Sequence, residues 1–438
     1  MSMFNRLFAR APQLIKWGKL ISVTGGAQIL IQGVGFVVGI YIIRMLSQSE
    51  YAYYTLANTM LGTMTVLADG GISTGVMAEG GKQWQNRKEL GEILATGMHM
   101  RRQFAIGSLI VSIPILFYLL LDQGMLWWES SLLILCLIPA FMAALSGSLL
   151  QIVPKLHQNI NELLKINVQI NVIRLILTLP VLLFFPFAAL AILASGFGQV
   201  VGNVQLRKLS IRKADWKTAA SPAYRRRIMA KVKKILPGSI YYCISGQITV
   251  WLVAFFSDTK SIAEIGALSR LMMLLMLVRL SVDMLIVPRY ARLPAVKQQV
   301  IVRFFQVLGL LLVLSAAIVG GVALFPDLFL YILGDAYMDL DYELVLMTLS
   351  SCLGLITGVA YMMSSSRGII PNPYLFIAVN ILGQVAVLYF FVDYTTLAGV
   401  IMFSVYSGLI TLGYRIADFL YQTLLKMQWS DQSVHLNP

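Results

Sequence analysis

The 438-residue sequence has little charge: 12% of its residues are charged, with 20 acidic against 34 basic side chains. Hydrophobic residues make up 58% of the chain. Too little polar surface therefore remains to coat a soluble globule of this length. This scarcity excludes a soluble protein, and the sequence predicts an all-α integral membrane protein.

Cysteine and histidine are also scarce, with three of each. The cysteines, Cys136, Cys243 and Cys352, lie far apart inside apolar stretches, and no histidine has a second ligand at metal spacing. We expect no metal site and no cofactor.

Apolar runs of about 20 residues recur along the chain, each long enough to cross a hydrocarbon core about 30 Å thick as a helix. Only a helix satisfies its own backbone hydrogen bonds there. We predict about twelve transmembrane helices. Their expected ranges are 20–43, 52–72, 103–121, 130–153, 166–185, 187–206, 236–257, 262–287, 304–326, 343–364, 374–392 and 395–414.

Lysine and arginine gather on alternate connecting segments, and short basic loops stay in the cytoplasm. Both termini are therefore expected to be cytoplasmic. The stretch from Arg207 to Lys234 alone holds eleven basic residues. Because this charge lies beside membrane spans, membrane lipids explain it better than nucleic acid does. The predicted domains are an N-terminal bundle at 1–206, a basic cytoplasmic linker at 207–235, a C-terminal bundle at 236–414 and a cytoplasmic tail at 415–438.

The predicted outside loops are short. The longest, roughly 326–342, has four aspartates but no histidine, lysine or arginine. A membrane enzyme that polymerises or ligates glycans needs a nucleophile, a base and an orienting group, and no such set is present in these loops. Transport is the function that remains, so we expect no enzyme.

Polar residues inside the spans are the candidate site, because a polar side chain that faces lipid is costly. Gln28 and Gln32 fall on one face of the first predicted span together with three glycines. Asn58 and Asp69 share a face of the second. Close helix packing explains the first of these stripes as well as cavity lining does.

Two arginines are candidates for contact with a cargo. Arg174 lies near the middle of the fifth span, on one face with Asn171, and a guanidinium at that depth needs an aqueous cavity or an ion pair. In the eighth span, nine residues of straight helix would place Arg270 and Arg279 on nearly opposite faces. Arg279 and Asp283, four residues apart, are predicted to form a structural ion pair, which leaves Arg270 for the cavity. A fixed cation there suits an anionic cargo.

Two runs, RMLSQSEYAYYTLANTMLGTMTVLADGGI and GALSRLMMLLMLVRLSVDMLIVPRYARL, open the two predicted halves. They resemble polysaccharide flippases of the multidrug/oligosaccharidyl-lipid/polysaccharide exporter superfamily. The matching positions are Arg44, Leu46, Glu50, Tyr51, Asp69, Gly70 and Gly71 in the first run and Gly266, Arg270, Pro288 and Leu293 in the second. Their order is that of a duplicated transporter.

The resemblance implies a flippase of the bacterial cytoplasmic (inner) membrane, in which two six-helix bundles surround a central cavity and work by alternating access. Other polysaccharide assembly proteins would be its partners. Its cargo would be a polyprenyl-diphosphate-linked oligosaccharide, such as an O-antigen or exopolysaccharide repeat unit. The cavity residues expected to contact this cargo are Arg174, Arg270, Asn171, Asn58, Gln28 and Gln32. The candidates for coupling or gating are Asp69 and Arg44.

Two alternatives stay open. A cation-coupled drug or metabolite antiporter of the same superfamily would share the fold, but a cationic cargo needs acidic residues in the cavity, where Asp69 is the one clear deep carboxylate. A membrane glycan polymerase or ligase is disfavoured by the short outside loops. The seventh span carries Thr249, Val250 and Trp251 where relatives often have an acidic residue, which argues against cation coupling through this span.

Overall fold

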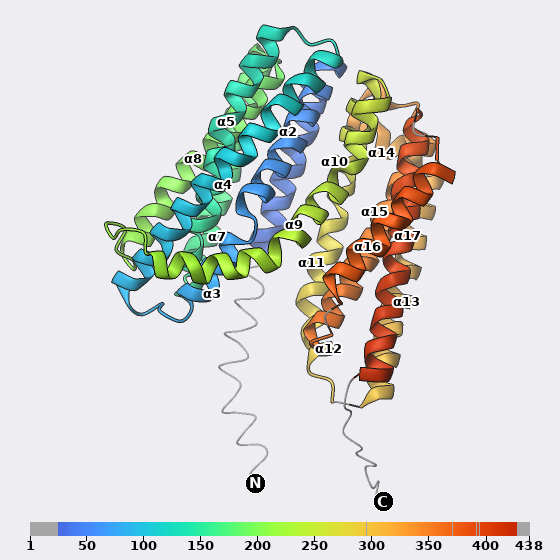
Figure 1. Ribbon diagram of the computed structural model, residues 1–438. Helices are drawn as coiled ribbons and strands as arrows, with labels where there is room; N and C mark the ends of the chain where they lie inside the picture. Colours follow the sequence, from blue (N-terminus) through green and yellow to red (C-terminus); the bar gives the residue numbers. More distant parts are fainter. Residues whose placement is uncertain (1–24, 295, 370, 391, 394, 427–438) are drawn as a thin grey trace, which may run out of the picture. The chain divides into compact units, whose positions relative to one another are not determined.

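The computed structural model describes residues 25–426 except for 295, 370, 391 and 394. Among these residues every regular element is a helix, and Figure 1 shows most of them as long rods. Eleven of the described helices are long and apolar enough to cross a membrane. The predicted all-α, multi-pass membrane fold is confirmed.

The helices follow one another with short connections. In chain order they are Gly25–Met45, α2 (Gln48–Asp69), α3 (Ile72–Gly80), α4 (Arg87–Asp122), α5 (Trp127–Leu150), α6 (Ile152–Leu156), α7 (Ile160–Phe184), α8 (Ala188–Ile211), α9 (Pro222–Phe256), α10 (Thr259–Met272), α11 (Leu275–Leu285), α12 (Val287–Ala291), α13 (Lys297–Leu324), α14 (Pro326–Leu333), η1 (Asp335–Tyr337), α15 (Asp341–Ser366), α16 (Pro373–Phe390), α17 (Leu397–Tyr421) and η2 (Gln422–Lys426).

Each predicted span contains helix, although the start of the first, 20–24, lies outside the described residues. The second predicted span corresponds to α2, which is absent from the eleven membrane-length helices. Its asparagine, threonine and tyrosine side chains lower its hydropathy. The eleven helices and α2 together account for the twelve predictions.

Helices that carry charge at one end run further than predicted. α4 begins at Arg87 rather than near 103, and the side chain of Asn86 caps it by accepting hydrogen bonds from the amides of Lys88 and Glu89 at 3.2 and 3.3 Å. α9 begins at Pro222, inside the predicted linker, and α17 continues to Tyr421, past the predicted end at 414. Charged residues end an apolar run without ending the helix that carries it.

The eighth predicted span, 262–287, is not one straight helix. It is divided into α10, α11 and α12. At the first break the amides of Met273 and Leu274 donate to the carbonyls of Arg270 and Leu271, three residues back, at 3.2 and 3.1 Å. These tighter turns replace the α-helical pattern there. The argument that Arg270 and Arg279 lie on opposite faces assumed one straight helix, and that assumption does not hold.

The chain forms two compact units, which we call unit 1 and unit 2. Unit 1 contains Met1–Val250 and Asp258–Gly266, and unit 2 contains Trp251–Ser257 and Ala267–Pro438. The boundaries between them fall inside α9 and α10 and in the short segment between these helices.

The core of unit 1 includes the first part of α9, which crosses the ends of the longer helices (Figure 1). Its residues Tyr224, Ile228 and Val232, spaced four apart, pack into a buried cluster with side chains of α3, α4 and α5. The basic residues between them remain largely exposed. Much of the predicted linker is therefore an amphipathic helix with one face in the core of unit 1.

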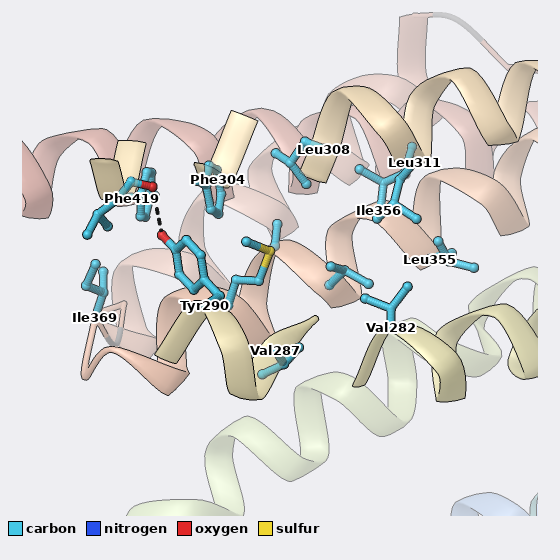
Figure 2. Packing of buried hydrophobic residues seen from close by; sticks show 14 residues of the cluster. Val282, Val287, Tyr290, Phe304, Leu308, Leu311, Leu355, Ile356, Ile369 and Phe419 are labelled. Atoms are coloured by element: carbon cyan, nitrogen blue, oxygen red, sulfur yellow. Dashed lines mark hydrogen bonds between the residues drawn. The ribbon is translucent and has the colours of Figure 1, made fainter. Parts of the chain in front are cut away.

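The core of unit 2 is built around two aromatic rings. Phe304 of α13 stacks on Phe419 of α17, with ring centroids 3.8 Å apart. Tyr290 of α12 lies beside them, and its hydroxyl donates a hydrogen bond of 3.2 Å to the carbonyl of Val300 (Figure 2). This cluster fixes α12, α13, α15 and α17 against one another.

Candidate functional site

Asp69, Gly70 and Gly71, from the first of the two runs, form the corner between α2 and α3. Gly70 and Gly71 have φ values of 49° and 91°, a backbone conformation that side chains with a Cβ rarely adopt. A Cβ on Gly71 would also lie 2.9 Å from the Ile235 side chain of α9. The paired glycines are required both by the sharp corner and by the close approach of α9.

Asp69 anchors a polar network at this corner. Its Oδ1 accepts hydrogen bonds from the amide and hydroxyl of Ser73 at 3.2 and 2.7 Å, and from Nη2 of Arg101. Arg101, on α4, is 2% exposed. Its other guanidinium nitrogen, Nη1, donates to Ser148 Oγ at 2.6 Å and to the carbonyl of Leu145. One ion pair thus ties together α2, α3, α4 and α5.

Sequence reasoning missed Arg101. Arg101 and Arg102 directly precede the predicted third span, 103–121, yet the first is buried and the second is exposed. Adjacent helical residues point about 100° apart, so only one of the two can face the core. No local pattern gives the partner, since Asp69 lies on another helix. The candidate coupling residue Asp69 is thus already engaged by a cation.

The predicted stripe on α2 follows the unburied side of that helix. Asn58 is exposed, whereas residues 51–57 are buried. Gly62 lies one turn further along, and Gln247 Nε2 of α9 is 3.7 Å from where its Cβ would be. Thr65 bonds back to the carbonyl of Leu61 at 2.7 Å. This side of α2, with the α9 side chain beside it, is a polar strip within unit 1.

The glutamines of the first described helix, Gln28 and Gln32, are half-buried. The neighbouring Gly26 and Gly33 have open space where a Cβ would stand, so these two glycines are not required by close packing. Arg44, at the far end of the same helix, is exposed. Gly39, which shares the predicted face with the two glutamines, is buried.

Arg174 lies where α7 meets the small residues of α8. A Cβ on Gly198 would be 2.7 Å from the carbonyl oxygen of Ile170 and 3.5 Å from Cβ of Arg174. The Nε of Arg174 is buried and has no hydrogen-bond partner among the described residues. Asn171, one turn before it, donates to the carbonyl of Asn167 at 2.9 Å. Arg174 therefore keeps an unmatched donor inside unit 1.

Arg270 belongs to unit 2 and occupies the last turn of α10, directly before the helix break. Its Nη1 lies 3.7 Å from Sδ of Met273. Arg279 and Asp283 lie together on α11, with Nε and Oδ2 3.7 Å apart. The guanidinium of Arg279 also covers Gly358 of α15, where a Cβ would be 3.1 Å from Nη1.

A second buried arginine was also missed. Arg415 of α17 is 6% exposed, and its guanidinium carbon lies 4.1 Å from the ring centroid of Phe376 and 4.5 Å from that of Tyr361. Such stacking stabilises a cation in a site with little water. The sequence placed Arg415 at the start of the tail because the apolar run ends there.

Glu79 is a buried carboxylate on α3, 2% exposed. Its Oε1 accepts hydrogen bonds from Lys231 Nζ of α9 at 2.7 Å and from Lys82 Nζ at 2.9 Å. These two ammonium groups hold the pKa of Glu79 below its ordinary value, with the bond to Lys231 as the largest cause. The pair fastens the amphipathic part of α9 to the rest of unit 1.

No protein-family model and no curated sequence matches the chain. Solved structures do match. An inward-facing multidrug resistance MATE family transporter of the MOP superfamily superposes with a TM-score of 0.70 at 14% identity, over 91% of this chain and 94% of that one. The lipid II flippase MurJ, in an inward closed conformation, gives 0.72 at 13% identity over 90% of both chains.

A MOP superfamily transporter from Pyrococcus furiosus, described by the reversed polarity of its binding pocket, gives a TM-score of 0.61 at 14% identity. It is matched over 92% of this chain and 94% of that chain. Identities this low establish the fold alone. The chain therefore has the fold shared by these transporters and the flippase.

Proposed function

From a fold common to drug transporters and a lipid-linked glycan flippase, we propose that this chain is a flippase for a polyprenyl-diphosphate-linked oligosaccharide. The proposed site is the bacterial cytoplasmic membrane, with both termini in the cytoplasm. The cargo would pass from the cytoplasmic to the outer leaflet for surface polysaccharide assembly. Two six-helix bundles, 1–206 and 236–414, would alternate access around a central cavity.

The observation that carries the proposal is that a carboxylate inside the spans is already paired, whereas an arginine inside the spans forms no ion pair. Asp69 is already held by Arg101 and Ser73. Arg174, in contrast, forms no ion pair in the part of the chain that the structure describes, and its Nε, like that of Arg101, is buried without a hydrogen-bond partner. A guanidinium with unmatched donors binds phosphate oxygens well. An anionic cargo suits this arrangement.

The same contrast weighs against the antiporter alternative. A cationic drug needs a carboxylate that is available to it, and the carboxylate of Asp69 would have to leave a buried guanidinium first. Breaking a buried ion pair costs several kcal/mol. Because the chain shares its fold with a MATE transporter, the fold does not separate the two functions, and the experiment below does.

We assign the remaining roles by position. Arg174 and Arg270 would contact the diphosphate or an acidic sugar, and Asn171, Asn58, Gln28 and Gln32 would bond to sugar hydroxyls. Asp69 would act in gating, because the Asp69–Arg101 pair joins four helices and any rearrangement of their ends must alter it. Arg44 would gate the opposite end. The lipid tail would stay in the bilayer while the glycan crosses in water.

The test is mass spectrometry of lipid extracts from a deletion strain. We expect a polyprenyl-diphosphate-linked oligosaccharide to accumulate and to be cleared when the gene is restored. Arg174→Ala and Arg270→Ala, at equal amounts in the membrane, should fail to clear it. Arg102→Ala is the matched control, because Arg102 is exposed and lies outside the proposed cavity.

Two outcomes would change the assignment. If no lipid-linked oligosaccharide accumulates in a strain with intact upstream glycosyltransferases, the small-molecule antiporter becomes the better reading. If it accumulates but both arginine variants clear it fully, the flippase assignment stands and the two arginines are not the cargo contacts.

A further inference from the structure

Unit 1 contains a groove that the proposed transport cycle does not use. It has a volume of about 650 Å³ and lies between α4, α5 and α8, with Trp216 of the connection between α8 and α9 at one end. The proposed cargo contacts lie on other helices, namely Gly25–Met45, α2, α7 and α10. The groove is therefore separate from the candidate cavity.

The groove runs along the helices from the middle of unit 1 to its basic end. On α5 it extends from Pro139 to Leu150, which is roughly 16 Å at 1.5 Å per residue. On α8 it ends at Arg207, in the last turns of that helix. One end of the groove, which we call the deep part, therefore lies among apolar residues. The other, which we call the shallow end, lies beside charged residues.

The deep part of the groove is apolar. Met142, Val200 and Val204 line it and are 39%, 43% and 52% exposed. The polar residues there are already satisfied: Ser146 donates to the carbonyl of Met142 at 2.8 Å, and Asn203 donates to the carbonyl of Ala143 at 2.7 Å and accepts from Gln199 at 3.0 Å. A ligand in this part gains by burying hydrocarbon.

The shallow end offers a cation. Arg207 is exposed and has no hydrogen bond or ion pair among the residues that the structure describes. Trp216 stands beside it, with its indole Nε1 donating to Ser210 at 2.9 Å. An aromatic ring next to an arginine is the pairing found where a helix leaves the hydrocarbon for the headgroup region.

We propose that this groove binds a phospholipid with an anionic headgroup, drawn from the surrounding bilayer. Its phosphate would meet the guanidinium of Arg207, and an acyl chain would lie along Met142, Val200 and Val204. A soluble anion would leave the apolar part unfilled, and a zwitterionic lipid would bring the positive charge of its own headgroup close to Arg207. The proposal does not depend on the identity of the transported cargo.

The experiment is native mass spectrometry of the full-length protein in mild detergent, titrated with phosphatidylglycerol or with phosphatidylcholine. We expect phosphatidylglycerol to bind more tightly and to one saturable site. Arg207→Gln should weaken its binding by about tenfold, since one charge-assisted hydrogen bond is lost. Lys208→Gln removes the same charge from the next residue, which does not line the groove, and should change binding less than twofold.

A second pair of variants tests the apolar part. Val204→Trp fills the groove and should abolish the saturable site, whereas Leu193→Trp adds the same ring to an exposed position of α8 outside the groove. Equal weakening by Arg207→Gln and Lys208→Gln would reduce the effect to general surface charge and overturn the proposal. Saturable phosphatidylglycerol binding that survives Val204→Trp in a monodisperse protein would place the lipid elsewhere and also overturn it.

Discussion

In unit 1 the guanidinium of Arg101 is buried against the carboxylate of Asp69, whereas in unit 2 the guanidinium of Arg415 is buried between the rings of Tyr361 and Phe376. Both are nearly inaccessible. A carboxylate cancels the charge of its partner, but an aromatic ring stabilises a cation without neutralising it. The same residue type is thus held by two chemistries in the two units.

The difference has an energetic consequence. A buried ion pair is costly to break, because removing one partner leaves the other charge uncompensated in a site of low polarity. Removing a cation from between the rings of Tyr361 and Phe376 leaves no opposite charge on those rings uncompensated. Unit 1 should therefore be the more sensitive of the two to the loss of a single buried arginine.

The largest expected effect is that of Arg101→Met. It leaves the carboxylate of Asp69 with Ser73 as its remaining partner in the network, so the free energy of unfolding should fall by about 3 kcal/mol. Thermal denaturation in detergent, followed by loss of the monodisperse peak in size-exclusion chromatography, measures the destabilisation.

Two further variants serve as controls for Arg101→Met. Arg102→Met changes the adjacent, exposed arginine and should leave the midpoint nearly unchanged. Asp69→Asn combined with Arg101→Met removes both charges and should recover part of the loss. An equal midpoint for Arg101→Met and Arg102→Met would contradict the buried ion pair.

A smaller effect is expected in unit 2. Arg415→Leu should lower the free energy of unfolding by about 2 kcal/mol, because the cation–π contacts with Tyr361 and Phe376 are lost. Arg415→Lys keeps a cation over the rings and should retain part of the stability. The same denaturation assay applies, with the exposed Arg303→Leu as control. A loss as large as that of Arg101→Met would erase the contrast between the units.

The smallest effect concerns Glu79, whose pairs with Lys231 and Lys82 keep its pKa below its ordinary value of 4.5. A carboxylate with a lowered pKa stabilises the folded state above that ordinary value, and the contribution is lost as the pH falls through the folded pKa. Glu79→Gln should therefore cost on the order of 1 kcal/mol at pH 7 and progressively less below pH 4.5.

The measurement for Glu79 is the denaturation midpoint as a function of pH. Asp339→Asn, in unit 2, removes an exposed carboxylate and should show no such dependence. If the difference between wild type and Glu79→Gln stays constant down to pH 3, Glu79 does not fasten α9 through its charge.

The number and order of the helices followed from apolar runs, because the membrane demands about 20 apolar residues for each crossing. The ends of the helices could not be predicted from the apolar runs. α4 starts sixteen residues before its predicted span, at Arg87 rather than 103, since a helix that leaves the membrane continues for as long as its other face has a core to pack on. The amphipathic start of α9 has the same cause.

The motifs were recognised from the sequence, but their physical reasons were not. Asp69, Gly70 and Gly71 form a corner, and Gly266 gives α10 room beside α2, where a Cβ would lie 2.3 Å from Thr55 Oγ1. Both requirements come from residues distant in the chain. No proline or glycine marks the helix break after Arg270 in the sequence. The prediction from hydropathy alone therefore continued one helix across the break.

The passage of the chain between the two units inside α9 and α10 has a consequence for how the sequence can change in length. One residue inserted after Val250 or Gly266 would turn the remaining part of that helix by about 100° around its axis. The connection at 82–85, which lies within unit 1, is mostly exposed and joins two helices without continuing either. Single-residue insertions should be tolerated there and not inside α9 or α10.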